Sequence, residues 1–328
     1  MKLSGAGELS LLDSLRRRFK DRAEGLILGI GDDAAVIRHR GDLLLTTDMM
    51  VEGVHFDLSW TTAYQLGYKL VAVNVSDIYA MGGSPRFLLL NFSSPGSCTT
   101  SFFNDLFDGV KAALKEYGAV LIGGDISASD RIMLSATVVG SATKVVRRSG
   151  ARAGDRIYVT GPLGDSACGL DLLRKISRPV DLNRRSYKGM PLKWNMIRPL
   201  AARHLMPKVR NSSRYAVRAN AMMDISDGLL IDLSRLCRES RVGATVYEEQ
   251  LPISDELKAA ADHLGKDPLS YALSGGEDYE VLFTAPPDAE VDACCIGKIT
   301  GRGMFMIKKD NRRIKISAKG YQHFSLQR

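Results

Sequence analysis

The chain lacks the short sequence signatures of the commonest nucleotide-binding enzymes. Its 328 residues contain no GxxxxGK loop followed by Ser or Thr, which excludes a Walker-type ATPase. They contain no GxGxxG turn, which disfavours a Rossmann cofactor site, and no HRD or DFG segment, which excludes a protein kinase. An HExxH helix or a histidine cluster is also missing, and this disfavours zinc catalysis.

Cysteines and long apolar runs are scarce as well. The five cysteines are odd in number and form no CxxC pair. Cys294 and Cys295 are adjacent in an expected strand, so we expect buried, reduced thiols. The first residues show no apolar segment of a signal peptide, and no run of about 18 apolar residues predicts a membrane span. These features together predict a cytoplasmic protein.

The net charge of +8 does not by itself indicate a nucleic-acid-binding protein. Basic residues are spread along the chain, and their densest runs lie at residues 16–18, 144–152 and 308–315. No recognition motif or aromatic-interleaved basic patch accompanies these runs. We therefore expect a solvated surface that favours small anionic substrates, and no nucleic acid partner.

What the chain does contain is a set of six short segments that place carboxylates beside Gly, Ser or Thr. Each one alone is ordinary turn chemistry. Together they suggest a Mg²⁺–nucleotide site built from many loops, because Mg²⁺ prefers oxygen ligands and glycine lets the backbone approach a phosphate. The segments are residues 31–33, 46–48, 74–77, 123–125, 224–228 and 275–278.

The apolar periodicity predicts an α/β protein of two domains, which 328 residues can accommodate. We expect a domain boundary near residue 148. The expected helices span 9–19, 62–81, 102–117, 165–175, 195–205, 210–219 and 227–237. The expected strands span 26–30, 34–37, 43–47, 87–92, 119–122, 132–141, 156–160, 279–284 and 293–299, with a further strand from 221 and a hairpin at 305–316. Asn74 and Asp77 are three residues apart and should project from one side of their helix.

Seven ordered motifs resemble those of the thiamine-monophosphate kinase family. They are IGDDAA (30–35), TDMMVEGVHF (47–56), AVNVSD with AMGG (72–83), IGGD (122–125), RSGA (148–151), DISDGL (224–229) and LSGGEDYE (273–280). The resemblance covers nearly the whole chain. The GDD and xSD elements alone are similar to the wider aminoimidazole-ribonucleotide synthetase-like superfamily.

The resemblance implies a fold and a reaction. It implies an N-terminal sheet domain, residues 1–148, that binds ATP and Mg²⁺ and forms a homodimer. It implies a C-terminal α/β domain, residues 149–328, that closes the active site. The implied activity is direct in-line transfer of the ATP γ-phosphoryl group to thiamine monophosphate, which gives thiamine diphosphate.

The resemblance also assigns roles to residues of this chain. Mg²⁺ ions would be bound by Asp33, Thr46, Thr47, Asp48, Asp77, Asp125, Asp224 and Asp227. ATP would be contacted by Gly124, Asp125, Arg148 and Ser226, and the thiamine phosphate by His55, Glu277 and Tyr321. The implied catalytic set is Asp48, Asp77, Asp125, Asp227 and Arg148.

Two positions depart from the usual pattern of the family. Thr46 replaces a common Ser and keeps the hydroxyl group. Ile126 follows Gly-Gly-Asp where Thr is common, so a hydroxyl group near the metal ions is missing. The reaction itself needs no strong base, because the acceptor is a phosphate with a second pKa of about 6. The obstacle is anion repulsion, which metal ions and Arg148 would offset.

Four other functions remain alternatives at this point. A selenophosphate synthetase would carry a reactive Cys or Sec near its start, whereas no cysteine precedes Cys98. A carbamoyl-dehydrating maturation enzyme would end in a cysteine-containing tail, whereas this chain ends at residues 324–328 without one. A purine-pathway ligase gains no support from residues 54–56 and 277–279. A basic nucleic-acid-binding protein with structural metals would show binding that falls steeply with salt.

Overall fold

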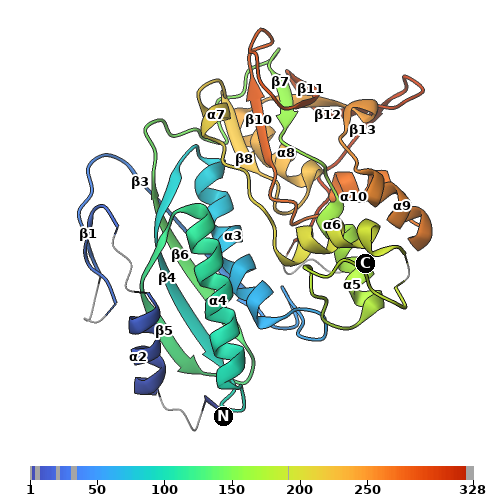
Figure 1. Cartoon of the computed structure of the whole chain (residues 1–328). Coiled ribbons are helices and arrows are strands. Elements are labelled where there is room, and N and C mark those ends of the chain that lie inside the picture. Colours follow the sequence, from blue (N-terminus) through green and yellow to red (C-terminus); the bar gives the residue numbers. More distant parts are fainter. Residues whose placement is uncertain (1, 4–7, 20–22, 31–34, 191, 323–328) are drawn as a thin grey trace. The chain divides into compact units, whose positions relative to one another are not determined.

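The computed structural model describes residues 2–3, 8–19, 23–30, 35–190 and 192–322, and the chain folds into two compact units (Figure 1). Unit 1 takes residues 1–78, 83–143 and 178–180, and unit 2 takes residues 79–82, 144–177 and 181–328. Both units combine helices with a sheet, which confirms the predicted α/β class. The division predicted at residue 148, and the roles assigned to the two domains, stay predictions.

Unit 1 is built on a four-stranded mixed sheet in the order β3-β6-β4-β5. Its strands are β3 (Leu43–Val51), β6 (Met133–Ser141), β4 (Ser84–Ser94) and β5 (Val120–Ala128). β6 is antiparallel to β3 and β4, and β4 is parallel to β5. Helices α3 (Ala63–Ala80) and α4 (Thr100–Tyr117) cover one face of the sheet. Helix α2 (Glu8–Arg18) and the paired strands β1 (Leu26–Leu28) and β2 (Val36–Ile37) precede them in sequence.

Large apolar side chains fill the layer between this sheet and its helices. The ring of Phe92 on β4 lies 5.6 Å from that of Phe103 and 6.5 Å from that of Phe107, measured between centroids. Leu134 of β6 and Leu70 of α3 are fully buried. Each such side chain contributes about 1.5–3 kcal/mol when it is buried, so this layer fixes α3 against the sheet.

Helices α3 and α4 approach so closely that their contact requires glycine. A Cβ atom on Gly67 of α3 would lie 2.0 Å from the carbonyl oxygen of Leu106. A Cβ atom on Gly109 of α4 would lie 1.9 Å from the carbonyl oxygen of Tyr64. Both carbonyl oxygens belong to the backbone of a regular helix, so neither can move away by a rotamer change as a side chain could. The two glycines therefore set the distance between the helices.

The other face of the unit 1 sheet exposes apolar side chains. Side chains alternate along a strand, so the odd-numbered residues of β3 point away from α3. Among them Leu43, Leu45 and Met49 are exposed, and Leu45 retains 68% of its accessible surface. The β1–β2 segment packs beside Phe87 and Val139 of the sheet. Beside that segment, the exposed apolar side chains of β3 form a patch of Leu43, Leu45 and Met49.

Unit 2 is built on a seven-stranded sheet in the order β13-β12-β9-β11-β7-β10-β8. Neighbouring strands are antiparallel except β9 and β12, which are parallel. The strands are β7 (Arg156–Val159), β8 (Ala221–Asp224), β9 (Gly243–Tyr247), β10 (Val281–Ala285), β11 (Cys294–Thr300), β12 (Met304–Ile307) and β13 (Arg313–Lys315). The helices are α5 (Asp165–Ile176), α6 (Trp194–Leu205), α7 (Ser213–Ala216), α8 (Leu229–Ser240), α9 (Asp255–Leu264) and α10 (Pro268–Ser274), with a 3-10 turn at Glu248–Gln250.

Both faces of the unit 2 sheet are covered. On one face, Leu229, Leu233 and Leu236 of α8 belong to a buried cluster with residues of β7 and β8. On the other, the ring of Phe283 stacks at 5.1 Å on Tyr158 and at 5.0 Å on Tyr215. The α8 stripe repeats every three or four residues, as expected for a helix that buries one side. The packed sheet then holds fixed the loops that follow β8 and precede β10.

Several predicted elements are confirmed and others are wrong in detail. The three segments 9–19, 62–81 and 102–117 are helical as predicted. Residues 123–125 are not a turn: β5 continues through them to Ala128, hydrogen-bonded to β4. The helix predicted at 210–219 is the single turn α7, and α8 begins at Leu229 rather than Asp227.

Three elements were not predicted from the sequence, and one cysteine differs from its predicted burial. β9, α9 and α10 were not predicted. All five cysteines are free, but Cys294 is exposed rather than buried, because it occupies the outward position at the start of β11. Within the part of the chain that the structure describes, no helix has both the length and the apolar character needed to cross a membrane.

Candidate functional site

The first group of candidate residues lies between β3 and α3 in unit 1. The hydroxyl group of Thr46 donates a hydrogen bond of 2.5 Å to Oδ2 of Asp77. The backbone N–H of Asp48 donates to Oδ1 of Asn74 at 3.0 Å. The even-numbered residues of β3 thus face α3, and the prediction that Asn74 and Asp77 project from one side of their helix is confirmed. Oxygen donors from a strand and a helix meet at this place.

Thr47 points the other way, because side chains alternate along β3. Its hydroxyl group donates to the carbonyl oxygen of Ala136 at 3.0 Å and accepts a hydrogen bond from the hydroxyl group of Thr137 at 3.2 Å. The side chains of Thr46 and Thr47 therefore cannot bind one metal ion together. On the sheet face that carries the side chain of Asp48, Thr47 can offer a metal ion only its backbone oxygen.

Asp125 lies on β5, at the opposite edge of the sheet from β3. The register places Met49, Ser135, Asn91 and Asp125 in one row across the four strands. Three steps of about 4.8 Å separate the edge strands, or about 14 Å in all. Asp125 also projects to the same face as Met49, away from Asp48. Within one chain, the structure does not bring Asp125 together with Asp48 and Asp77.

Gly124 has a backbone conformation that suits only glycine. Its φ angle is +149°, and a Cβ atom there would lie 1.8 Å from the carbonyl oxygen of Leu90. The next residue, Asp125, accepts a hydrogen bond from the N–H of Ile126 at 2.9 Å on its own Oδ1. The missing side chain at Gly124 therefore makes room for the backbone of β4, with which this residue pairs.

His55 lies in the turn that follows β3. Its ring Nδ1 accepts a hydrogen bond from the backbone N–H of Val51 at 3.1 Å. Its backbone N–H donates to the carbonyl oxygen of Val51 at 2.9 Å. An Nδ1 that accepts a hydrogen bond leaves the proton of a neutral imidazole on Nε2. The ring is therefore oriented by the backbone and presents an N–H donor.

A second group of candidate residues assembles in unit 2, around the loop after β8. The N–H of Glu277 donates to the carbonyl oxygen of Ser226 at 2.7 Å, and that of Tyr279 donates to Ile225 at 2.9 Å. The N–H of Tyr321 donates to the carbonyl oxygen of Asp227 at 2.9 Å. Three segments that are far apart in the sequence thus meet at residues 225–227.

Asp227 is held by a neighbouring arginine on α8. Nη1 of Arg235 donates to Oδ2 of Asp227 at 2.6 Å and to Oδ1 of Asp232 at 2.7 Å. The other oxygen of Asp232 accepts from the N–H groups of Asp227 and Gly228, at 3.0 and 3.1 Å. Burial raises the pKa of Asp232 to about 6, and the charge of Asp227 adds to this increase. Asp227 is therefore oriented from its backbone and its side chain.

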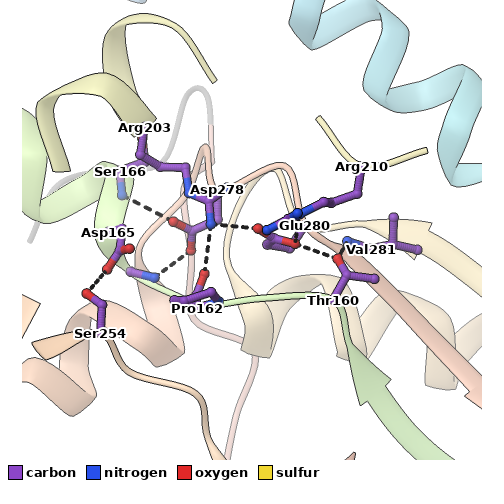
Figure 2. A network of polar contacts seen from close by, with 11 residues as sticks. Thr160, Pro162, Asp165, Ser166, Arg203, Arg210, Ser254, Asp278, Glu280 and Val281 are labelled. Carbon is purple, nitrogen blue, oxygen red and sulfur yellow. Dashed lines mark hydrogen bonds and ion pairs between the residues drawn. The ribbon is translucent and has the colours of Figure 1, made fainter. Parts of the chain in front are cut away.

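Residues 277–280, which we call the acidic turn, are anchored by a buried polar network (Figure 2). Asp278 accepts hydrogen bonds from the N–H groups of Gly164 at 2.6 Å and Ser166 at 3.2 Å, at the start of α5. Glu280 accepts from Arg203 Nη2 at 2.6 Å and from the hydroxyl group of Thr160 at 2.5 Å. These contacts tie the turn to β7, α5 and α6.

Two carboxylates of this network have raised pKa values because they are buried. Burial raises the pKa of Asp278 to about 7, although the N–H groups of Gly164 and Ser166 and the charge of Arg203 oppose the increase. Burial also raises the pKa of Asp165, which accepts a hydrogen bond from Ser254 Oγ at 2.6 Å. Buried carboxylates need such partners, because an isolated buried charge is very unfavourable.

The other candidate residues of unit 2 are placed as follows. Asp224 is buried at the end of β8. The side chain of Tyr321 is 49% exposed. The side chain of Arg148 is exposed, and its carbonyl oxygen accepts a hydrogen bond from Ser240 Oγ at 3.1 Å. Asp33 lies outside the described residues.

The donor atoms in unit 1 fit Mg²⁺ better than a transition metal. Among the described residues, no three His, Cys, Asp or Glu side chains form a metal-binding group. The oxygen atoms of Thr46 and Asp77, with Asp48 and Asn74 adjacent, supply hard ligands only. Mg²⁺ usually takes one or two protein carboxylates together with water and substrate phosphates. A small, oxygen-only set of ligands is therefore what a Mg²⁺–nucleotide site needs from the protein.

Comparison with known proteins identifies the family. Residues 31–142 match the family model of the AIR synthase related protein N-terminal domain, and residues 152–310 match that of its C-terminal domain. The thiamine-monophosphate kinase of Aquifex aeolicus is 37% identical over 99% of this chain and 100% of its own length. The enzyme of Escherichia coli K12 is 35% identical over 97% of this chain and 98% of its own length. The chain belongs to the thiamine-monophosphate kinase family.

Solved structures agree with this assignment. A structure of AaThiL complexed with AMPPCP and TMP is 36% identical, the match covers 99% of both chains, and the TM-score is 0.76. The thiamine-monophosphate kinase of Stenotrophomonas maltophilia K279a is 33% identical over 93% of this chain and 97% of its own, with a TM-score of 0.78. The hydrogenase maturation protein HypE, at 17% identity and a TM-score of 0.74, shares the fold.

The kinase motifs left out several residues that organise the site. Arg235 was missed, although its spacing of three residues from Asp232 is a recognisable helical ion pair. Arg203 and His204 were also missed. They lie on α6, about 75 residues before the acidic turn that they contact, and no local pattern in the sequence predicts such a contact.

Proposed function

We propose that this protein phosphorylates thiamine monophosphate with ATP and so forms thiamine diphosphate. The observation that carries the proposal is the full-length similarity, at 36% identity, to a structure complexed with AMPPCP and TMP. The full-length similarity to curated thiamine-monophosphate kinases from several bacteria supports it as well. ATP is then a co-substrate.

Mg²⁺ is the metal ion that we propose for this reaction. In unit 1, Thr46 and Asp77 would hold it, since their side-chain oxygen atoms lie 2.5 Å apart between β3 and α3, and Asp48 of the same strand would join them. We propose that several Mg²⁺ ions are bound, with Asp33, Thr47, Asp125, Asp224 and Asp227 as the further ligands. When it is bound, Mg²⁺ neutralises the charge of the phosphates and orients them.

The proposed substrate contacts follow from the chemistry of each group. Gly124, Asp125, Arg148 and Ser226 would contact ATP, where the guanidinium of Arg148 can pair with a phosphate. His55 offers an N–H donor to the thiamine phosphate. Glu277 offers a negative charge to the cationic thiazolium, and Tyr321 offers an exposed ring.

We propose direct transfer from ATP without a phosphoenzyme. The acceptor oxygen belongs to a phosphate that is largely dianionic at neutral pH, so it is already a nucleophile. The protein's task is then to align two anions and to reduce their repulsion. A single in-line displacement inverts a chiral γ-phosphate, so we expect inversion of configuration. Net retention, or label trapped on the protein from γ-labelled ATP alone, would argue for a covalent intermediate.

A direct assay tests the proposed activity. ATP consumption should be rapid with thiamine monophosphate and Mg²⁺, and should remain at background with free thiamine or with no acceptor. The reason is that the acceptor phosphate is already a nucleophile, whereas the alcohol of thiamine would need a base to activate it. Chelation of Mg²⁺ should abolish turnover, and added Mg²⁺ should restore it. Rapid phosphorylation of thiamine without activity on its monophosphate would overturn the proposal.

We also propose that two chains form a homodimer through the exposed face of the unit 1 sheet. Leu43, Leu45 and Met49 form an apolar surface there, and such surfaces mark association sites. Light scattering at low micromolar concentration should give about twice the chain mass of 35.9 kDa. The absence of a nucleic acid partner and the cytoplasmic location stay predictions, and salt-dependent retention on DNA would contradict the first.

A pair of matched variants tests this interface. Leu45→Asp places a charge on the apolar face and should shift the mass toward that of a monomer. Val217→Asp is the control, because Val217 lies in unit 2 and has the same 68% exposure. It should leave the dimer intact. A wild-type monomer, or a Leu45→Asp variant that remains dimeric, would remove the sheet face from consideration.

A further inference from the structure

The acidic turn is held by two consecutive residues of one helix. Arg203 and His204 lie in the last turn of α6, and Arg203 Nη2 donates to Oε1 of Glu280 at 2.6 Å. Nδ1 of His204 lies 3.1 Å from Oε2 of Glu277. The first and last carboxylates of the turn are thus both attached to α6. In Figure 2, dashed lines join the guanidinium of Arg203 to Glu280 and to the carbonyl oxygen of Pro162.

The contact between His204 and Glu277 has a defined direction. Nδ1 of His204 lies within ion-pair distance of Glu277, and because a carboxylate only accepts hydrogen bonds, a hydrogen bond between them is donated by Nδ1. Oγ of Ser166 lies 3.2 Å from the same nitrogen. His204 is buried, with 4% of the residue exposed, and its imidazole is held between α5, α6 and the acidic turn. A buried donor of this kind fixes the carboxylate that it contacts.

Glu277 differs from its neighbours in the turn because it still reaches solvent. Asp278 and Glu280 are buried, whereas the side chain of Glu277 is 30% exposed. Its backbone is fixed in a left-handed conformation with φ +65° by the hydrogen bond to Ser226. Because the backbone is fixed, the entropic cost of ordering Glu277 for a ligand is that of its side chain, and a contact that holds the carboxylate lowers this cost.

We propose that His204 is a positioning residue that prepares Glu277 for the cationic part of the substrate. It holds one carboxylate oxygen from the buried side and so lowers the entropic cost of binding an organic cation on the exposed side. The proposal rests on the proposed function and on the contact of Glu277 with thiamine monophosphate. It predicts that His204 affects the affinity for thiamine monophosphate and leaves that for ATP unchanged.

Substitutions of His204 separate a positioning role from a structural one. His204→Leu keeps a similar volume and removes the donor, so it should raise KM for thiamine monophosphate about tenfold. KM for ATP should stay within about twofold of the wild type. Calorimetry with thiamine monophosphate alone should show the same loss of affinity. His204→Asn restores an N–H donor near the position of Nδ1 and should recover most of the affinity.

Three further variants complete the test. Ser166→Ala removes the hydroxyl group beside the imidazole and should raise KM for thiamine monophosphate about twofold to threefold, even if His204→Leu does not fold. His204→Leu combined with Glu277→Gln should be no worse than Glu277→Gln alone, because the two residues act as one unit. His263→Leu is the matched control, since His263 is an exposed histidine in the last turn of α9. It should leave both KM values unchanged.

The outcomes distinguish the inference from the function on which it rests. If the wild type phosphorylates thiamine monophosphate but His204→Leu leaves its KM unchanged, or raises both KM values alike, the positioning role is wrong. A lack of rescue by His204→Asn would have the same meaning. If the wild type does not phosphorylate thiamine monophosphate at all, the proposed function fails and the inference fails with it.

Discussion

Asp77→Asn is expected to reduce kcat by about a thousandfold or more while the protein stays folded. Asp77 lies between α3 and β3, where it accepts the hydroxyl hydrogen bond of Thr46. Asparagine keeps the shape of the side chain and removes the negative charge that would bind Mg²⁺. Loss of one preorganised electrostatic contact typically costs a factor of about 10²–10³ in kcat, and a disturbed metal ion should cost more. Asp48→Asn and Asp227→Asn should also remove most of the activity.

Two controls separate a metal ligand from a structural carboxylate. Asp13→Asn removes the same charge from unit 1 as Asp77→Asn does, but at an exposed position on α2. The ion pair of Asp13 with Arg16 is long, at 3.9 Å, and contributes little to stability. It should retain normal turnover. Raised Mg²⁺ concentration should partly restore the Asp77 variant, and its melting temperature should stay near that of the wild type. If all three aspartate variants kept near-normal turnover, these acids would be structural and the proposed site would be wrong.

Gly109→Ala is expected to lower the free energy of unfolding by about 3 kcal/mol or more. In an isolated helix this substitution would stabilise, by about 1 kcal/mol. Here the new Cβ atom would lie 1.9 Å from the carbonyl oxygen of Tyr64, so α3 and α4 would have to separate. The sign of the effect therefore tests whether the close helix crossing exists. Denaturant unfolding followed by circular dichroism measures it.

A matched glycine provides the control for this prediction. Gly301 has open space where a Cβ atom would be placed, so Gly301→Ala should change the free energy of unfolding by no more than about 0.5 kcal/mol. Gly67→Ala, which meets the carbonyl oxygen of Leu106 at 2.0 Å, should repeat the loss seen for Gly109→Ala. An increase in stability for either helix variant would mean that the helices are farther apart than described.

Local patterns in the sequence predicted those features that depend on neighbouring residues. The spacing of Asn74 and Asp77 predicted that both project from one side of a helix, and their hydrogen bonds to β3 confirm it. Helical periodicity has the same cause in any context, because residues three or four apart share a face. Gly123 and Gly124 misled the prediction. Glycine favours turns in general, whereas here it lets β5 continue along β4 with a local shift of register.

The sequence by itself determined the α/β class, the order of the main elements, and the motifs that identify the kinase family. These follow from periodicity and from short runs of residues, which act locally. Only the tertiary structure decided which groups meet. It joined Thr46 to Asp77, separated Asp125 from both across the sheet, and attached Glu277 to His204 of α6. Such contacts depend on how strands and helices pack, and residue spacing along the chain carries no record of that packing.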